Sequence, residues 1–216
     1  VNNTASANSS SAFGYFNTAG GLASSAFGWS NTASAENASA FGYVNEASGL
    51  ASSALGFRNK AANENASAVG YGNNAGGVAS SAFGFSNVAK VDYASAFGYG
   101  NIVSGEHGIA SGYNNNISGN FASAFGTDNT VSNIRSAAVG SNNTVSGEVS
   151  NAFGYNNIAS GSKSNVFGTG NTVSGSSSTA VGTANEVAAE NSTAIGNNNT
   201  ISSGAENSAA LGNNIS

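Results

Sequence analysis

The stretch SSAFGYFNTAGGLA, residues 10–23, decides the fold because the chain goes on repeating it. Residues 24–37 read SSAFGWSNTASAEN, and residues 38–51 read ASAFGYVNEASGLA. In each block a small residue, an alanine, a large apolar residue and a glycine keep the same places. A fixed period of this kind is typical of a solenoid, in which every repeat forms one coil and buries its apolar side chains only against its neighbours.

Two marker residues show that the period hardly slips. Glycine recurs at every multiple of 14 from Gly14 to Gly196, and asparagine recurs at the same spacing from Asn3 to Asn199. The next glycine of the series is Gly212, so the last coil carries two additional residues. We therefore expect one domain over residues 1–216, with an irregular last coil at 197–216.

The composition by itself favours disorder, but the order of the residues opposes it. Charged residues make up 7% of the chain, which contains 30 glycines and no proline, cysteine or methionine. Such a bias is common in low-complexity segments. With five cations and a net charge of −5, the chain has no basic stripe for nucleic acid. Without cysteine it has no disulfide or thiolate metal site, and no apolar run is long enough for a membrane-spanning helix.

A fourteen-residue coil is too short for two helices and a turn. No helical periodicity is present, and glycine, serine, asparagine and threonine disfavour helix. The length suits two short strands and two turns, with parallel pairing between successive coils. The sequence therefore predicts an all-β, parallel β-roll of about fifteen coils.

The residues beside the marker glycine suggest how a coil is filled. Strand alternation places Ala12 and Phe13 on opposite faces. We expect the column of large residues that begins at Phe13 to fill the core, facing the column of small apolar residues that begins at Ala19. Ser111 replaces the large residue in one coil while Ile109 appears two positions earlier, which keeps the volume on that face constant. The alanine column would then face outward and allow another chain to approach closely. Its first members are Ala12, Ala26, Ala40, Ala54, Ala68, Ala82 and Ala96.

The repeated unit resembles that of a known family. SSAFGYFN (residues 10–17), NASAFGYVN (37–45) and NSTAIGNNN (191–199) are similar to the NSVAIGxxS motif in the heads of YadA-like trimeric autotransporter adhesins. The resemblance covers essentially the whole chain, although serine stands where the motif has valine. It implies a left-handed β-roll, a homotrimer, a bacterial outer-membrane location with residues 197–216 leading to a neck, and neither enzyme activity nor a cofactor. In such a homotrimer we predict the alanine column as the trimer interface.

The residue after the marker glycine is aromatic in eight consecutive coils. Exposed tyrosine and tryptophan are common at binding hot spots, so this column is our candidate ligand-binding strip. The alternative is an aromatic ladder that only seals the edge of the roll. The column consists of Tyr15, Trp29, Tyr43, Phe57, Tyr71, Phe85, Tyr99 and Tyr113.

Other polar residues have simpler explanations. The asparagine column is expected to form a buried ladder between coils, because unpaired amides inside a solenoid are costly. Acidic residues recur at one turn position and suggest a solvated edge. His107, the only histidine, lies beside Glu106 with no nucleophile placed by any motif. We therefore expect no catalytic or metal site.

The resemblance leaves the binding partner open. It implies a host cell-surface receptor, for example an immunoglobulin-like receptor of the carcinoembryonic-antigen type, or a matrix protein such as collagen, fibronectin or laminin. One alternative is a spacer segment of a trimeric fibre with no ligand of its own. Another is an ice-binding solenoid, but the threonine column that would bind ice is interrupted by Glu46, Lys60 and Val88.

Overall fold

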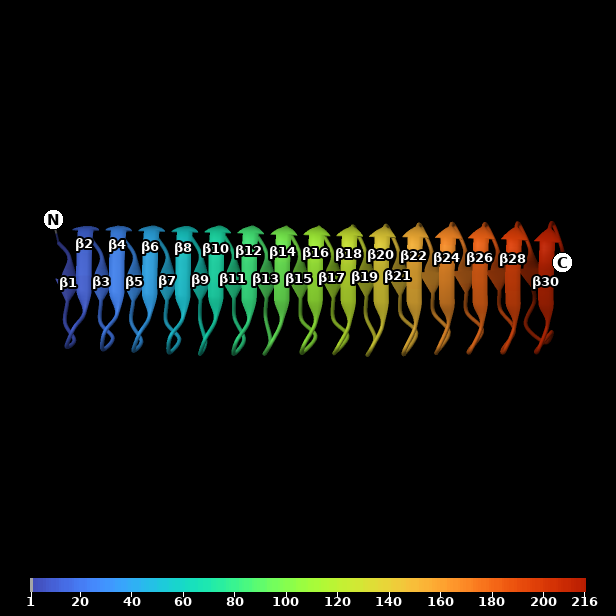
Figure 1. The fold of residues 1–216 in the computed structure, drawn as a ribbon, viewed down its shortest axis with the longest axis horizontal. Helices are drawn as coiled ribbons and strands as arrows, with labels where there is room; N and C mark the ends of the chain where they lie inside the picture. Colours follow the sequence, from blue (N-terminus) through green and yellow to red (C-terminus); the bar gives the residue numbers. More distant parts are fainter. Residues whose placement is uncertain (1) are drawn as a thin grey trace. The chain divides into compact units, whose positions relative to one another are not determined.

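Strands and turns make up the described chain, residues 2–216 of the computed structural model. It divides into two compact units, Val1–His107 and Gly108–Ser216, which we describe one at a time. Within each unit, five-residue strands alternate along the chain with two-residue strands (Figure 1). Residues 2–216 contain no helix, and hence no helix long and apolar enough to cross a membrane.

Unit 1 contains strands β1 to β15. Its five-residue strands are β2 (Ser11–Tyr15), β4 (Ser25–Trp29), β6 (Ser39–Tyr43), β8 (Ser53–Phe57), β10 (Ser67–Tyr71), β12 (Ser81–Phe85) and β14 (Ser95–Tyr99). Its two-residue strands are β1 (Thr4–Ala5), β3 (Thr18–Ala19), β5 (Thr32–Ala33), β7 (Glu46–Ala47), β9 (Lys60–Ala61), β11 (Asn74–Ala75), β13 (Val88–Ala89) and β15 (Ile102–Val103).

Unit 2 contains strands β16 to β30. Its five-residue strands are β16 (Ile109–Tyr113), β18 (Ser123–Thr127), β20 (Ala137–Ser141), β22 (Asn151–Tyr155), β24 (Asn165–Thr169), β26 (Thr179–Thr183), β28 (Thr193–Asn197) and β30 (Ala209–Asn213). Its two-residue strands are β17 (Asn116–Ile117), β19 (Thr130–Val131), β21 (Thr144–Val145), β23 (Ile158–Ala159), β25 (Thr172–Val173), β27 (Glu186–Val187) and β29 (Thr200–Ile201).

Successive coils pair in parallel with a register of fourteen residues. In unit 1, Phe83 of β12 lies opposite Phe97 of β14. In unit 2, Phe153 of β22 lies opposite Phe167 of β24. The five-residue strands form one sheet and the two-residue strands form the other; we call them the long-strand sheet and the short-strand sheet. The expected fold class is confirmed: the chain is an all-β parallel β-solenoid of about 15 turns.

The core of each coil is built from small side chains. The second residue of a long strand and the second residue of a short strand both point inward, and Ala26 and Ala19 are fully buried there. Unit 2 uses larger residues on the short strands, among them Ile117 and Val131, which are also fully buried. Stacked coils thus enclose a continuous apolar column, which no single coil could bury.

Two expectations about these columns are wrong. The phenylalanine column faces outward, and Phe13, Phe41 and Phe97 keep 73, 37 and 38% of their surface exposed. The alanine column faces inward instead. Its members Ala26, Ala40, Ala54, Ala68, Ala82 and Ala96 are fully buried, and Ala12 in the first coil is half-buried. Alternation fixes only that neighbours take opposite faces, and the space inside a narrow coil accepts alanine rather than phenylalanine. These alanines therefore offer no surface for a trimer interface.

The asparagine column forms a buried ladder, as predicted. In unit 2, Asn129 Nδ2 donates to Asn115 Oδ1 and to the Gly140 carbonyl oxygen, both at 2.9 Å. Asn129 Oδ1 in turn accepts from the backbone N–H and the Nδ2 of Asn143 at 3.1 and 3.0 Å. Each amide satisfies buried polar atoms in the coils on both sides, so the ladder ties the coils together.

Two residues in a coil adopt the left-handed conformation. In one coil of unit 2 they are Asn142 (φ 57°) and Val149 (φ 55°), seven residues apart. The next residue in each case is polar and buried, Asn143 or Ser150. Two residues after that comes a buried apolar residue, Val145 or Ala152. A coil therefore consists of two seven-residue halves that share one order of conformation and burial.

The last coil carries the predicted irregularity. Thr193 of β28 pairs with Ala209 of β30, sixteen residues along the chain. The additional residues lie in the turn before β30, where the Asn207 N–H donates to the Glu190 carbonyl oxygen at 3.1 Å. Strand pairing resumes after this turn, because a turn can lengthen without changing which residues of a strand point inward.

Candidate functional site

The outward face of the long-strand sheet carries a row of large apolar side chains beside a row of mostly serine, threonine and asparagine side chains. Its middle row consists of the third residue of each long strand, which we call the phenylalanine row. In unit 1 the row contains Phe13, Phe27, Phe41, Leu55, Val69, Phe83 and Phe97. In unit 2 it contains Ser111, Phe125, Val139, Phe153, Phe167, Val181, Ile195 and Leu211. The parallel row at the first strand position, which begins at Ser11, carries no charged residue in the described strands. Contiguous apolar surface of this kind marks interaction sites.

The short-strand sheet presents a different outward face. Its outward row includes Glu46, Lys60 and Glu186 as well as several threonines. Lys60 Nζ and Glu46 Oε1 form an exposed ion pair at 3.0 Å between neighbouring coils. Charged, hydrated groups resist burial against another protein. Of the two broad faces, the long-strand sheet is therefore the better suited to contact with a partner.

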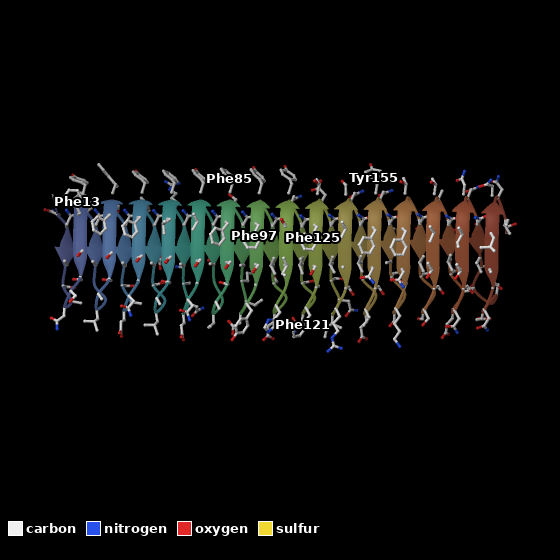
Figure 2. The ribbon with its side chains drawn as sticks, in the orientation of Figure 1. Phe13, Phe85, Phe97, Phe121, Phe125 and Tyr155 are labelled. Atoms are coloured by element: carbon white, nitrogen blue, oxygen red, sulfur yellow. The ribbon has the colours of Figure 1, made fainter. Side chains whose placement is uncertain are left out.

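Aromatic side chains project in three directions. Figure 2 shows Phe97 of unit 1 and Phe125 of unit 2 over the face of the long-strand sheet. Within unit 1, Phe85 projects from one edge of the sheet; within unit 2, Tyr155 projects from one edge and Phe121 from the turns at the opposite edge. The face and the two edges are thus separate surfaces.

The predicted aromatic column forms a stacked ladder along one edge of unit 1. Successive ring centroids from Tyr43 through Phe57, Tyr71 and Phe85 to Tyr99 lie 4.9, 4.8, 4.7 and 4.8 Å apart, with interplanar angles of 2–4°. These distances equal the spacing of paired strands, so the sheet register itself stacks the rings. We call this set, together with Tyr15 and Trp29 at its start, the aromatic ladder.

The ladder is stacked and exposed at the same time. Tyr15, Trp29 and Tyr71 keep 38, 47 and 42% of their surface accessible, whereas Phe57 is half-buried. Because the faces of the rings are used in stacking, the ring edges and the tyrosine hydroxyl groups are what a partner would meet. Tyr113, the last residue predicted for this column, lies in unit 2 and is also exposed.

The equivalent strand position is polar over most of unit 2. The residue after the marker glycine becomes threonine, serine or asparagine in every strand after β16 except β22, where it is Tyr155. At the next position along the chain, exposed asparagine amides of neighbouring coils hydrogen-bond to one another in place of ring stacking. Asn142 Nδ2, for example, donates to Asn156 Oδ1 at 2.8 Å. The aromatic surface is therefore concentrated in unit 1.

Charged groups near these surfaces are few. The Arg58 guanidinium lies 5.2 Å from the centroid of the Phe57 ring, a cation–π distance that covers part of the ladder. The acidic residues of the turns, such as Glu36 and Glu190, are exposed, and one of them, Asp92, accepts a hydrogen bond from the Val78 N–H at 2.8 Å. This supports the expectation that the acidic turn position is a solvated edge.

The surroundings of His107 are those of a surface residue. Its ring stacks on Tyr93 with centroids 4.6 Å apart, and its Nε2 lies 3.8 Å from Glu106 Oε1. No group of three or more metal-binding side chains occurs among residues 2–216. The histidine therefore belongs to an exposed turn rather than to a recognisable reaction centre.

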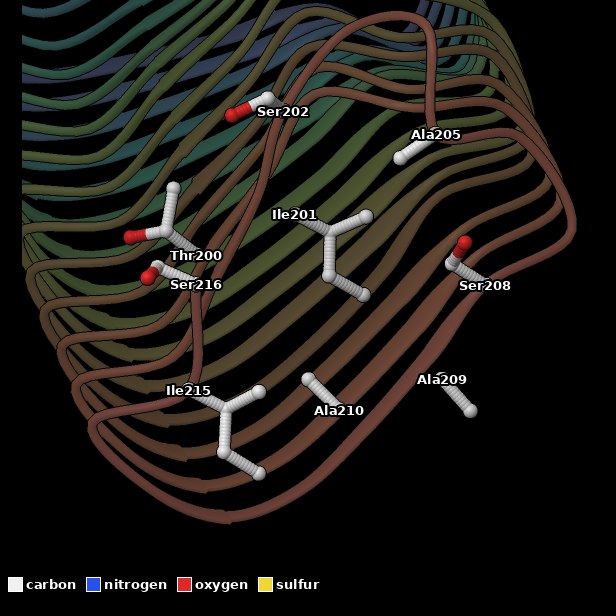
Figure 3. A pocket seen from close by; sticks show the side chains of 9 residues that line it. All are labelled: Thr200, Ile201, Ser202, Ala205, Ser208, Ala209, Ala210, Ile215 and Ser216. Atoms are coloured by element: carbon white, nitrogen blue, oxygen red, sulfur yellow. The ribbon is translucent and has the colours of Figure 1, made fainter.

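A small cavity lies between the last strands of unit 2. It has a volume of about 280 Å³ and is shown in Figure 3. Its lining residues are Thr200, Ile201, Ser202, Ala205, Ser208, Ala209, Ala210, Ile215 and Ser216. The lining is apolar and hydroxylic without a charged group, so it offers no means of orienting an ionic ligand.

Sequence reasoning missed two exposed apolar surfaces. The first is the phenylalanine row. The second is the left-handed turn row, where Tyr93, Phe121 and Val149 keep 49, 52 and 39% of their surface exposed. The available signal was the seven-residue half-repeat. Ala19 lies two residues after Asn17, and Ala26 lies two residues after Ser24, seven positions further along the chain. The two alanines are therefore equivalent positions of the half-repeat, and both point inward.

The comparison with known families agrees with this geometry. The sequence matches the YadA head domain repeat at residues 19–44, 47–73, 75–101, 92–115, 118–143 and 174–199, which together cover more than half of the chain. The chain belongs to the YadA head family. The predicted resemblance is thereby confirmed. YadA heads are adhesin-type domains of the bacterial cell surface rather than enzymes. No curated protein matches the sequence.

Proposed function

We propose that this YadA head attaches bacteria to host cells or extracellular matrix by binding a host protein through the aromatic ladder. The exposure of the stacked rings carries the proposal. Tyr15, Trp29 and Tyr43 keep 38, 47 and 40% of their surface accessible although each ring packs on a neighbour. Stacked rings lose little conformational entropy on binding, because they are already immobilised.

The proposed assembly is a homotrimer formed through the outward face of the long-strand sheet. That face carries the phenylalanine row and no charge, whereas the short-strand sheet presents Glu46 and Lys60. Burying apolar side chains such as Phe41 and Phe125, which are exposed in the single chain, would stabilise the trimer. A trimer offers three ladders, and many heads on one cell would turn weak sites into firm attachment.

The wider setting follows from the family. We propose that residues 1–216 act as one head at the outer membrane, with 197–216 leading towards a neck. The candidate ligands are an immunoglobulin-like receptor of the carcinoembryonic-antigen type and the matrix proteins collagen, fibronectin and laminin. The serine at Ser11 and Ser25, where the family motif has valine, places collagen below the other candidates.

Binding to these candidates can be measured directly. The trimeric chain would be tested on epithelial monolayers and on immobilised receptor, collagen, fibronectin and laminin. A variant with Trp29→Ser, Tyr43→Ser and Tyr71→Ser should lose at least about tenfold in affinity for the ligand that the native chain binds, because hot-spot aromatics carry most of the binding free energy.

The matched control removes apolar side chains of similar exposure from the left-handed turn row. It carries Tyr93→Ser, Phe121→Ser and Val149→Ser and should bind as the native chain does, while circular dichroism confirms that both variants are folded. Equal binding by the ladder variant and the native chain would reject the ladder as the site.

A spacer function is the alternative. It is favoured by the stacking itself, because centroid distances of 4.7–4.9 Å show that the rings stabilise neighbouring coils whether or not a ligand binds. A native trimer that binds neither cells nor any immobilised protein would favour the spacer.

A further inference from the structure

A repeating outer face creates a problem for assembly between copies of this chain. In the proposed homotrimer, on which this inference rests, the phenylalanine row of each copy meets the same row of the others. Neighbouring long strands repeat the same positions, as Ser81 and Phe83 repeat at Ser95 and Phe97. A slip by one coil, about 4.8 Å, would therefore replace most contacts by equivalent ones. Only a departure from the repeat can select one register.

Most departures in the phenylalanine row change only the size of the side chain. Leu55 and Val69 in unit 1, and Val139 and Val181 in unit 2, keep an apolar residue at the third strand position. Such positions accept a slipped neighbour with a small void, because apolar side chains of similar volume exchange at modest cost.

Strand β16 departs in a different way, because it inverts the pattern. Its outward residues are Ile109 and Ser111, whereas β18 beside it carries Ser123 and Phe125 at the paired positions. Ala110 between them remains fully buried, so the coil itself is undisturbed. The bulky side chain has moved two residues along the strand, a distance of about 6.7 Å, and a hydroxyl group stands in its place.

The inversion lies on the outer surface rather than in the core. Ile109 and Phe125 keep 40 and 44% of their surface exposed in the single chain. Ala110 fills the inward position of β16, so Ile109 and Ser111 on either side of it lie outside the coil. Folding of the single chain therefore does not require an isoleucine at one position and a serine at the other.

We propose that the Ile109–Ser111 inversion sets the axial register in which copies of this chain associate. We call this pair of residues the register key, or key. In register, each copy presents Ile109 and Ser111 at the same height as its partners. Ile109 then lies level with Ile109 of the neighbouring copies, and Ser111 lies level with Ser111. After a slip by one coil, Ile109 faces a serine like Ser123, and Ser111 faces a phenylalanine like Phe125. That arrangement leaves a void at one position and places a hydroxyl group against an aromatic ring at the other. A single polar position selects register in coiled coils in the same way.

The key can be moved by one coil without changing the composition. The variant Ile109→Ser, Ser111→Phe, Ser123→Ile, Phe125→Ser carries the inversion on β18 instead of β16. The native 216-residue chain and this variant, one of them mass-labelled, would be unfolded together, refolded in equal amounts and analysed by native mass spectrometry. Random mixing leaves about one quarter of the trimers as pure species. We expect pure species to exceed about three quarters, because a mixed trimer either misaligns the two keys or, if it slips by one coil to align them, leaves a terminal coil without its contacts.

The control exchanges residues on the other sheet in the same two coils. Asn116 and Thr130 are paired and exposed, and the variant Asn116→Thr, Thr130→Asn should mix with the native chain at random. Random mixing by the key-shifted variant, with trimers present and circular dichroism unchanged, overturns the register key and leaves the homotrimer intact. A monomeric native chain overturns the homotrimer and the key together, whereas loss of host binding with sorted trimers overturns only the attachment function.

Discussion

Val149 is a β-branched residue held in the left-handed region at φ 55°, where its side chain crowds the backbone. Other coils place Asn37, Asn65 and Asn191 at the equivalent turn position, and asparagine tolerates this conformation. We predict that Val149→Asn raises the free energy of unfolding by about 1 kcal/mol, measured by chemical denaturation.

The control for this substitution is Ile158→Asn. Ile158 is also β-branched and similarly exposed, at 42%, but it lies in the extended strand β23. There the branched side chain favours the strand, so asparagine should lower the stability slightly. If both substitutions changed the stability in the same direction, the left-handed strain at Val149 would not be the cause.

At the scale of the strand, the marker glycine permits the close stacking of coils. Gly126 in β18 has φ +120°, and a Cβ atom built there would lie 2.0 Å from the carbonyl oxygen of Gly140 in the next coil. That contact is with backbone and cannot be relieved by rotating a side chain. Gly126→Ala should therefore force β18 and β20 apart and cost about 3 kcal/mol or more, measured by thermal and chemical unfolding.

Gly170 is the matched control for Gly126. It has φ +64°, but a Cβ atom there meets nothing within 4 Å. Gly170→Ala should cost only about 1 kcal/mol, which is the penalty of the left-handed region. Equal losses at the two positions would show that backbone conformation, and not the approach of the next coil, makes the marker glycine necessary.

The sequence was sufficient for the properties that depend on spacing. The period, the parallel register and the buried asparagine ladder all follow from residues that recur fourteen apart, as Asn115, Asn129 and Asn143 do. The choice of inward face was not predicted, because alternation separates Ala12 from Phe13 without saying which lies inside. The constant volume expected for Ile109 and Ser111 holds on the outer face instead.

The candidate site was predictable in position but not in form. The column that begins at Tyr15 was recognisable because it follows the marker glycine in every coil. Its stacking depends on how each strand continues after that glycine, which has φ +118° at Gly28 and Gly42. Only this geometry allows the same rings to stack on one another and remain accessible at their edges.

At the scale of the whole chain, a coil is the smallest segment that can be removed without damage. Each coil contributes one long strand and one short strand, and it pairs only with its neighbours. Deletion of residues 144–157 removes β21 and β22 together and joins Asn143 to Ile158, so both sheets and the asparagine ladder can close again. We expect this shortened chain to fold with the same circular dichroism per residue and to unfold within a few degrees of the native chain.

A deletion half as long should do more harm. Removing residues 144–150 takes away β21 but leaves β22, because the join falls between Asn143 and Asn151. Asn151 pairs with Ala137, so β22 begins about 13 Å back along β20 from Ser141. The join leaves three Cα–Cα steps, at most about 11 Å, for that return, so β20 and β22 cannot keep their pairing, and the short-strand sheet has a gap between β19 and β23. The gap cannot close without breaking the ladder of Asn129, Asn143 and Asn157, so hydrogen exchange should be fast around it. If the seven-residue deletion were tolerated as well as the fourteen-residue deletion, the half-coil rather than the coil would be the unit of stability.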